Sequence, residues 1–145
     1  MSDYELLKEL LKINGFCKMN TKGASMRPML FSGDAVILNA PDKEIKKRDV
    51  VLYDGKDETY ILHRVIGFYK DGYVIRGDNT FVKEYVSRER ILAYLVSFNR
   101  RGKHYNTSKV SYKIYSVFWT FIYPIRFVLH KMHIILGKIK RKIIK

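Results

Sequence analysis

The chain lacks the cross-links that hold many small folds together, because its 145 residues include one cysteine, Cys17. A single thiol excludes a disulfide framework within the chain, and it also excludes a zinc site built from cysteine clusters. The histidines form no close group with Cys17, and only His130 and His133 are near each other in the sequence. We therefore expect no metal site and no cofactor.

Acidic residues are missing from residues 100–145, which contain twelve of the 28 Lys and Arg residues. Residues 1–99 hold the remaining 16 basic residues together with all 14 acidic ones, so this part of the chain is nearly neutral. The formal net charge of +14 is thus concentrated near the C-terminus, whereas a nucleic-acid-binding domain usually carries basic charge over one face. A segregated cationic tail indicates contact with an anionic surface, either lipid or nucleic acid.

Long uncharged hydrophobic runs are also missing. No stretch of about 18 apolar residues occurs without a charge, which argues against a membrane-spanning helix. The N-terminus does not resemble a signal peptide, because residues 2–5 include two acids and Lys8, Glu9 and Lys12 interrupt the leucine-rich stretch that follows.

What the chain does contain is typical of a folded domain with many strands. Hydrophobic residues make up 47% and aromatic residues 14%, which is enough for a core and excludes a disordered chain. Runs of β-branched and aromatic residues alternate with turn signals such as Asp71-Gly72, a pattern typical of antiparallel strands. The expected strands cover residues 16–21, 35–38, 50–53, 59–66, 68–76 and 91–98. We therefore predict a mainly β fold, with a β domain over residues 16–99, an N-terminal helix and a C-terminal helical tail.

The N-terminal helix is expected to run from Ser2 to Ile13. Ser2 and Glu5 match the pattern of a capping box, and leucines at positions 6, 7, 10 and 11 form one apolar stripe. Asn14-Gly15 is a typical helix end. We interpret residues 1–15 as a helix that packs against the β domain.

Residues 100–145 form the third expected segment, a basic and aromatic tail whose character changes at Val110. Aromatic and apolar residues are dense from Ile114 to Leu129, and isoleucines alternate with Lys and Arg further on. A basic helix with an apolar face is typical of a membrane interface, so residues 110–145 are expected to contact a membrane surface. The alternative is a helix that closes the core and ends in solvent. The membrane interpretation predicts a peripheral or C-terminally anchored protein that is otherwise cytoplasmic.

Residues 23–34 combine two glycines, one proline and a Gly-Asp turn, and this composition predicts a rigid loop. Ser25 lies in the loop between an alanine and a methionine. Serines are common in loops, where they bond their own backbone, so Ser25 alone is a weak sign of a nucleophile. A serine nucleophile requires a base within hydrogen-bond reach, and often a third group that orients the base.

Two later features supply candidates for those roles. His63 lies in an expected strand 38 positions after Ser25, and the turn Gly77-Asp78-Asn79 follows it. A lone histidine in a strand is more often structural than catalytic, but its ordinary pKa of about 6.5 makes neutral imidazole a suitable base. The order of the serine loop, its Gly33-Asp34 pair, the histidine and the turn favours one joint site.

Four segments carry a resemblance to a known family. They are Gly23-x-Ser25-Met26-x-Pro28-x-Leu30-x-x-Gly33-Asp34-x-Val36, Arg48-Asp49-Val50-Val51-Leu52-Tyr53, His63-Arg64-Val65-Ile66 and Arg76-Gly77-Asp78-Asn79. Together they resemble the signal peptidase I and LexA-like superfamily of serine peptidases, over about residues 16 to 98. The Ser-Met-x-Pro loop is moderately specific by itself, and His-Arg-Val and Gly-Asp-Asn in register make the match specific.

This resemblance implies a serine endopeptidase with coiled antiparallel β-sheets, in which Ser25 attacks the peptide carbonyl. His63 stands where the eubacterial and LexA branches have a lysine base, so the chain is similar to the endoplasmic-reticulum-type, archaeal and sporulation-type signal peptidases. Asp78 matches the family's Gly-Asp-Asn aspartate, and Glu84 stands where the endoplasmic-reticulum-type branch has its triad acid. Both are candidates for the group that orients His63, with a slight preference for Asp78.

The same resemblance implies roles for the loop. The oxyanion is expected to be held by backbone N–H groups of the loop, including that of Ser25, in the segment that contains Gly23 and Ala24. Met26 and Pro28 are expected to shape the loop and the substrate channel. Gly23 stands where many signal peptidases have a serine hydroxyl donor, so the oxyanion hole is expected to rely on backbone alone. The implied partner is a peptide or preprotein, bound as an extended strand with small side chains before the cleaved bond.

Other functions remain open at this point. The N-terminal membrane anchor typical of signal peptidases is not found, so cleavage of a specialised leader peptide fits as well as general signal-peptide processing. One alternative is a non-enzymatic β domain that binds nucleic acid through its basic tail, although residues 1–15 are too short for a helix-turn-helix domain. Nucleic acid is therefore not the expected partner. The other alternative is a self-cleaving LexA-like regulator, although the alanines at 24, 35, 40 and 93 offer no convincing cleavage linker.

Overall fold

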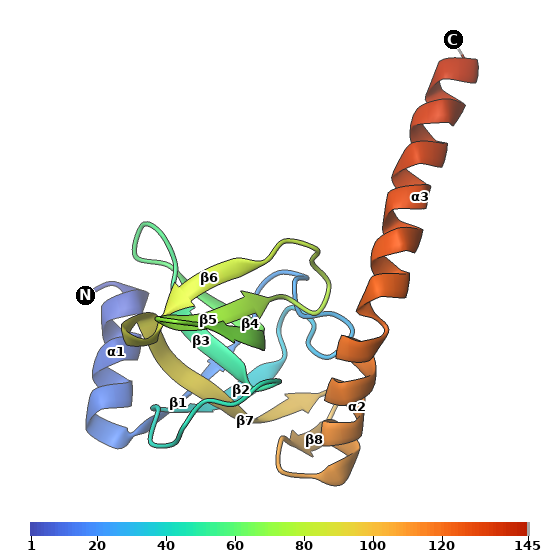
Figure 1. The fold of residues 1–145 in the computed structure, drawn as a ribbon. Coiled ribbons are helices and arrows are strands. Elements are labelled where there is room, and N and C mark those ends of the chain that lie inside the picture. The colour runs from blue at the N-terminus through green and yellow to red at the C-terminus, as the bar shows by residue number, and fades with distance from the viewer. Residues whose placement is uncertain (145) are drawn as a thin grey trace.

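An eight-stranded antiparallel sheet forms the body of the protein in the computed structural model, which describes residues 1–144 (Figure 1). In chain order the elements are α1 (Asp3–Asn14), β1 (Phe16–Asn20), β2 (Ala35–Asn39), β3 (Val50–Asp54), β4 (Tyr60–Tyr69), β5 (Gly72–Arg76), β6 (Glu84–Ser87), the 3₁₀ helix η1 (Arg88–Arg90), β7 (Ile91–Arg100), β8 (Lys103–Asn106), α2 (Val110–Phe121) and α3 (Tyr123–Ile143). The prediction of a mainly β, antiparallel fold with an N-terminal helix and a C-terminal helical segment is confirmed.

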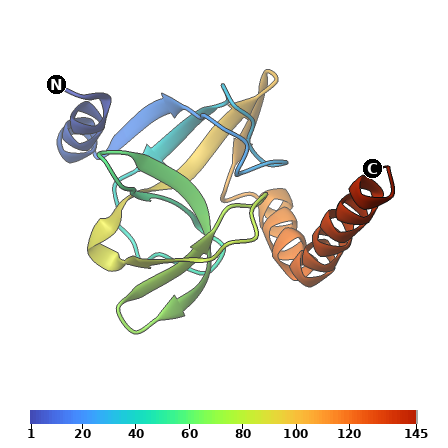
Figure 2. The same ribbon diagram turned by 90° about the horizontal axis from the view of Figure 1, so that it is seen from above.

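The sheet is strongly coiled. Its strand order is β1-β2-β7-β3-β4-β5-β6, and β8 pairs with β7. Register shifts interrupt the pairing of β2 with β7, of β3 with β7 and of β4 with β5. Such bulges increase the local twist of a sheet. Seen from above, β1 and β2 (blue to cyan) and β4 and β5 (green) form two separate wings (Figure 2).

Two hydrophobic clusters fill the wings, and β3 lies between them. Successive side chains of a strand point to opposite faces, so Val50 and Leu52 join one cluster while Val51 and Tyr53 join the other. The first cluster also contains Met26, Met29 and Leu30 from the loop that carries Ser25. The second contains Ile45, Val65, Tyr73, Ile75, Val86 and Ile91. The serine loop is thus anchored in the core at several points.

The N-terminal helix forms as its sequence predicts. The Ser2 hydroxyl accepts a hydrogen bond from the backbone of Glu5, and the Glu5 carboxylate accepts one from the backbone of Ser2 at 2.9 Å. Gly15 ends the helix with a φ of 73°, a left-handed conformation that glycine adopts readily. Leu7 and Leu11 are buried in the first cluster, so α1 covers the β1 side of the sheet.

Two short strands are not evident from the sequence. β6 and β8 are four-residue strands with few buried side chains, and they lack a clear alternation of apolar and polar residues. β8 forms a hairpin with β7 through Arg101 and Gly102, which both have positive φ and suit a two-residue hairpin turn. The expected division at residue 100 therefore falls within a continuous hairpin, and the tail is not a separate unit at that point.

The C-terminal segment contains two helices with different environments. α2 lies against the sheet, where Tyr112 and Tyr115 pack on the first cluster and Ser116 is buried (Figure 1). α3 starts with Pro124 in its first turn and projects away from the body. The expectation of a helix that closes the core thus describes α2, whereas α3 is exposed over its C-terminal half. Within residues 1–144, no helix combines the length and apolar character needed to cross a bilayer.

Candidate active site

The loop that carries Ser25 is fixed at its base by polar contacts. The Thr21 hydroxyl donates to the carbonyl of Phe31 at 2.7 Å, and the backbone N–H of Phe31 donates to the carboxylate of Asp34 at 2.8 Å. Gly23 has a φ of 83°, which explains why glycine is favoured there. Ser25 is half-buried at the turn that follows. The rigid loop expected from the glycines and the Gly-Asp pair is therefore present.

Two other predicted loop residues have different environments. Met26 is buried in the first cluster and also lines the groove beside Ser25, so it both anchors the loop and shapes its surface. Pro28 is exposed, and its carbonyl accepts a hydrogen bond from Arg100 of β7. Pro28 thus shapes the far side of the loop.

His63 lies near the middle of β4, where it pairs with Val51 of β3. The His63 side chain is 11% exposed. Its Nδ1 atom is 3.2 Å from the Tyr53 hydroxyl and 3.5 Å from the carboxylate of Glu84. The contact that orients His63 is therefore made through Nδ1, which leaves Nε2 for another role.

Gly77 is the point at which the serine loop and the histidine meet. A Cβ atom at this residue would lie 2.6 Å from the Ser25 carbonyl oxygen and 3.1 Å from His63 Nε2. Contacts under 3.0 Å are essentially never seen for real Cβ atoms, so only glycine allows this approach. Within residues 1–144 no hydrogen bond joins the Ser25 hydroxyl to Nε2, and catalytic hydrogen bonds are often long before substrate binds. The structure therefore brings the backbone of Ser25 and the imidazole of His63 close to the same glycine.

Asn79 holds the serine loop against this turn. Its backbone N–H donates to the Ser25 carbonyl at 2.8 Å, and its side-chain amide donates to the Ala24 carbonyl at 3.1 Å. The carbonyl groups of residues 24 and 25 are thus directed toward the turn. The Gly-Asp-Asn motif therefore has a structural role: Gly77 allows the serine loop to lie close to the turn, and the hydrogen bonds of Asn79 hold the loop there.

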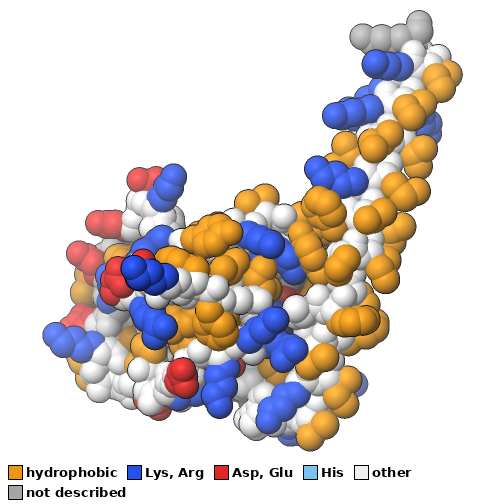
Figure 3. All heavy atoms as spheres, in the orientation of Figure 1, with side chains coloured by type: hydrophobic (Ala, Val, Ile, Leu, Met, Phe, Trp, Pro, Cys, Tyr) orange, Lys and Arg blue, Asp and Glu red, His pale blue; other side chains and the backbone are white. Residues whose placement is uncertain are grey.

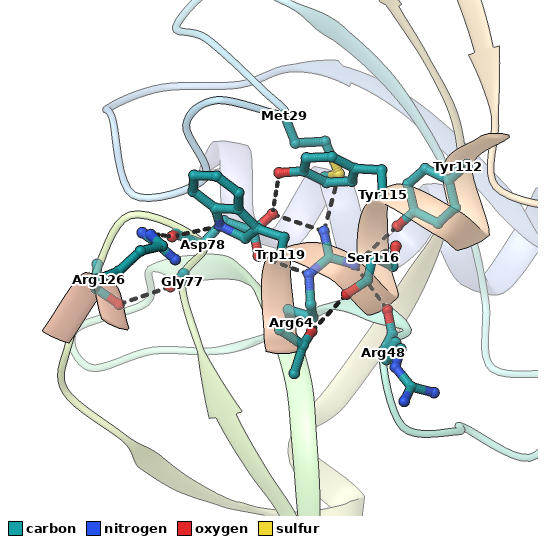
Figure 4. A network of polar contacts seen from close by, with 12 residues as sticks. Met29, Arg48, Arg64, Gly77, Asp78, Tyr112, Tyr115, Ser116, Trp119 and Arg126 are labelled. Carbon is teal, nitrogen blue, oxygen red and sulfur yellow. Dashed lines mark hydrogen bonds and ion pairs between the residues drawn. The ribbon is translucent and has the colours of Figure 1, made fainter. Parts of the chain in front are cut away.

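Asp78 does not orient His63, which corrects the slight preference that the sequence suggested. Its carboxylate forms a two-point ion pair with Arg64, at 2.7 Å to both Nε and a terminal nitrogen, and both side chains are buried (Figure 4). Burial alone would lower the pKa of Arg64, but the Asp78 carboxylate raises it above its ordinary value. Tyr115 also donates to Asp78, at 3.1 Å. The carboxylate of Asp78 is therefore occupied by Arg64 and Tyr115, and no hydrogen bond joins it to His63 within residues 1–144.

Glu84 is the carboxylate beside His63. It accepts a hydrogen bond from the Tyr53 hydroxyl, whose oxygen in turn faces His63 Nδ1. A Nδ1–H group can thus donate to Tyr53 while Tyr53 donates to Glu84, and this chain leaves Nε2 unprotonated and able to accept a proton. Burial lowers the pKa of His63, and the Glu84 carboxylate raises it in part. The imidazole is therefore held neutral near neutral pH.

Tyr53 is the part of this site that sequence reasoning missed. It is 2% exposed and belongs to the second hydrophobic cluster, so its pattern in β3 is that of an ordinary core residue. Burial raises its pKa, and the hydrogen bond to Glu84 adds to this effect. Tyr53 therefore stays protonated and serves as a donor. Nothing in the sequence around it signals this role.

A groove of about 520 Å³ opens beside the serine loop. Gly23, Ser25 and Met26 line one part of it, and Thr59 to Leu62 of the β4 region line another. Its apolar lining includes Met19, Met26, Leu30, Val36, Leu52 and Leu62. Ser25 thus lies beside a groove whose lining is largely apolar.

The site has no metal-binding character in the part of the chain that the structure describes. No group of three or more His, Cys, Asp or Glu side chains there is arranged to hold a metal ion. Cys17 is buried in the first cluster, and burial raises the pKa of its thiol, so it is an unreactive core residue.

Comparison with protein-family models and with curated proteins found no match. The features that bear on function are therefore the arrangement of Ser25, His63, Tyr53 and Glu84 and the residues of the four motif segments. These side chains come from the loop after β1, from β4, from β3 and from the start of β6. Their convergence is the feature that calls for a functional explanation.

Proposed function

We propose that the protein is a serine endopeptidase of signal-peptidase type that cleaves a signal or leader peptide. The observation that carries the proposal is the convergence at Gly77, where the Ser25 loop and His63 Nε2 approach the same backbone position. The backbone of a serine and the Nε2 of a histidine meet at this position, and the serine also lines a groove, which fits the pairing that nucleophilic catalysis by serine requires. The four motif segments support the same reading.

In the proposed reaction, His63 Nε2 takes the proton of the Ser25 hydroxyl as its oxygen attacks the peptide carbonyl carbon. The resulting oxyanion is held by backbone N–H groups of the loop, including that of Ser25. The imidazolium then gives its proton to the leaving amine, and the C–N bond breaks to form an acyl-enzyme. A water molecule, deprotonated by His63, hydrolyses the ester and restores the serine.

Tyr53 and Glu84 are positioning residues in this scheme. Their hydrogen-bonded chain meets His63 at Nδ1, on the side of the ring opposite the reacting nitrogen. The Glu84 carboxylate stabilises the imidazolium that forms when His63 accepts the proton. Asp78 supports the site from further away, because its ion pair with Arg64 fixes the turn that holds Ser25.

The groove indicates how a peptide binds. An extended segment lying past Ser25 would place alternate side chains into its apolar lining. The charged members of the lining are Asp3, Lys22 and Glu58, and its apolar members are more numerous, which suits the apolar and small residues of signal and leader peptides. The substrate class is therefore a peptide or preprotein segment of low charge.

The test is cleavage of a mixture of synthetic leader-like peptides, followed by mass spectrometry. Ser25→Ala and His63→Ala should each lower kcat/KM by about 10³-fold or more, with circular dichroism and melting temperature unchanged. Asn14 is exposed and does not line the groove, so Asn14→Ala serves as a control that should cleave normally. Cleavage that persists in Ser25→Ala would rule out the proposed nucleophile. Cleavage of the protein's own chain, and of no added peptide, would instead support the self-cleaving regulator.

A further inference from the structure

α2 and α3 carry an unpartnered apolar face. On α3 its large exposed side chains recur every three or four residues, the spacing of a single helix face. They are Ile125, Val128, Leu129, Met132, Ile135, Leu136, Ile139 and Ile143. On α2 the corresponding side chains are Val110, Ile114, Val117, Phe118 and Phe121. Figure 3 shows hydrophobic side chains gathered along the outer edge of the C-terminal helices.

Basic side chains accompany this face and no acidic ones do. The exposed cations of the two helices, together with the residue that caps α2 at its N-terminus, are Lys109, Lys113, Lys131, Lys138, Lys140, Arg141 and Lys142. None of them takes part in an ion pair within residues 1–144. At 100° per residue, Lys140 and Lys142 fall on either side of the apolar stripe, where long side chains can reach past it to a charged surface.

We propose that the apolar face of α2 and α3 binds the surface of an anionic lipid bilayer. Eight large apolar side chains on α3 need an apolar phase, and the flanking cations need anions next to that phase. The headgroup region of an anionic membrane supplies both, one above the other. A second copy of the chain would bring equal charges together, and nucleic acid would leave the isoleucines in water. The inference does not depend on the peptidase chemistry.

The helices are joined firmly to the rest of the molecule at their junction. The carbonyl of Asp78 accepts hydrogen bonds from Trp119 of α2, at 2.9 Å, and from Arg126 of α3, at 2.6 Å. Phe81 stacks on His130 of α3 with ring centroids 4.3 Å apart. Since the same turn holds the Ser25 loop through Asn79, binding of α3 to a surface fixes the direction in which the groove faces.

The experiment uses the full chain and sedimentation with vesicles of phosphatidylcholine alone or with about a third phosphatidylglycerol. The matched variants are two isoleucine pairs; three of the four residues lie on α3, and Ile144 is its C-terminal cap. Ile135→Gln with Ile139→Gln changes the apolar face, where these side chains are 55% and 47% exposed. Ile134→Gln with Ile144→Gln changes two positions outside the apolar face, at 37% and 73% exposure, with the same loss of carbon atoms.

The expected result is binding to the anionic vesicles that falls about tenfold or more with the first pair and less than threefold with the second. Raising the salt concentration should weaken binding, because the cations contribute through screened attraction. Helicity by circular dichroism checks that both variants stay folded. Equal loss in the two variants, or equal binding to neutral vesicles, would overturn the proposal. Concentration-dependent dimers abolished by the first pair, or salt-sensitive binding to a DNA duplex without vesicle binding, would assign the face to another partner.

Discussion

At the scale of single residues, the protonation of His63 controls the proposed chemistry. Burial of the imidazole lowers its pKa below the ordinary value of about 6.5, and the carboxylate of Glu84 opposes this shift. Only the neutral ring can accept the serine proton. The rate should therefore rise with pH through the pKa of His63 and be nearly constant above neutrality.

Glu84→Gln is predicted to move this acidic limb of the kcat/KM profile to lower pH. Removing the carboxylate removes the charge that stabilises the imidazolium, so the pKa of His63 falls further. The plateau rate should also drop by about tenfold or more, because the amide holds Tyr53 and the ring less well. Rates measured with a peptide substrate between pH 4 and 8 test this. A limb that moves to higher pH would contradict the role of Glu84.

At the scale of elements, the turn from Gly77 to Asn79 connects β4, the serine loop and α2. Asp78 pairs with Arg64 of β4, and Arg64 also donates to Ser116 of α2 at 3.0 Å. This cluster is buried, so its charges are not screened by solvent. Loss of the ion pair between Asp78 and Arg64 should therefore lower the stability of the fold, and any effect on the reaction should follow from that.

Asp78→Asn is predicted to lower the free energy of unfolding by about 3–5 kcal/mol, because it leaves the buried Arg64 guanidinium without a counter-charge. The control is Asp71→Asn, at an exposed turn, which should change stability by less than about 0.5 kcal/mol. Urea unfolding followed by Trp119 fluorescence measures both. A small effect of Asp78→Asn would show that the ion pair does not stabilise the turn.

The elements also show what a sequence can and cannot predict. α1 and the strands other than β6 and β8 follow from local patterns, and the loop with Ser25 and the strand with His63 follow from motif order. The sequence does not predict whether Asp78 or Glu84 orients His63, because this depends on which carboxylate Arg64 pairs with in the folded protein. Tyr53 looks like a core residue for the same reason. Contacts between side chains more than ten residues apart depend on tertiary packing, and the periodic pattern of apolar residues in the sequence does not predict them.

At the scale of the whole molecule, the boundary between the β body and the C-terminal helices is also the boundary between a nearly neutral part and a cationic part. The β body is nearly neutral, while the helices at the C-terminus carry cations and the apolar face (Figure 3). α2 is required by the body, since Tyr115, Ser116 and Trp119 complete the Asp78 cluster. The part of α3 beyond Lys131 is exposed and contacts little of the body.

Truncation after Lys131 is therefore predicted to leave the melting temperature within about 3 °C of the full chain, while vesicle binding weakens strongly because most of the apolar side chains of α3 are removed. Truncation after Ser108 should lower the melting temperature by more than about 10 °C, because it uncovers the ion pair of Arg64 and Asp78. Differential scanning calorimetry distinguishes the two. Equal destabilisation by both truncations would mean that the exposed half of α3 supports the fold.

The central claim is that Ser25 and His63 act as one catalytic unit, and a double-mutant cycle on peptide cleavage tests it most directly. Residues that share one step are not additive, so Ser25→Ala with His63→Ala should cleave no more slowly than Ser25→Ala alone. The account predicts equal residual kcat/KM for the single and double variants, at least about 10³-fold below the unmodified chain. Losses that multiply in the double variant, or a Ser25→Ala variant that cleaves at full rate, would contradict it.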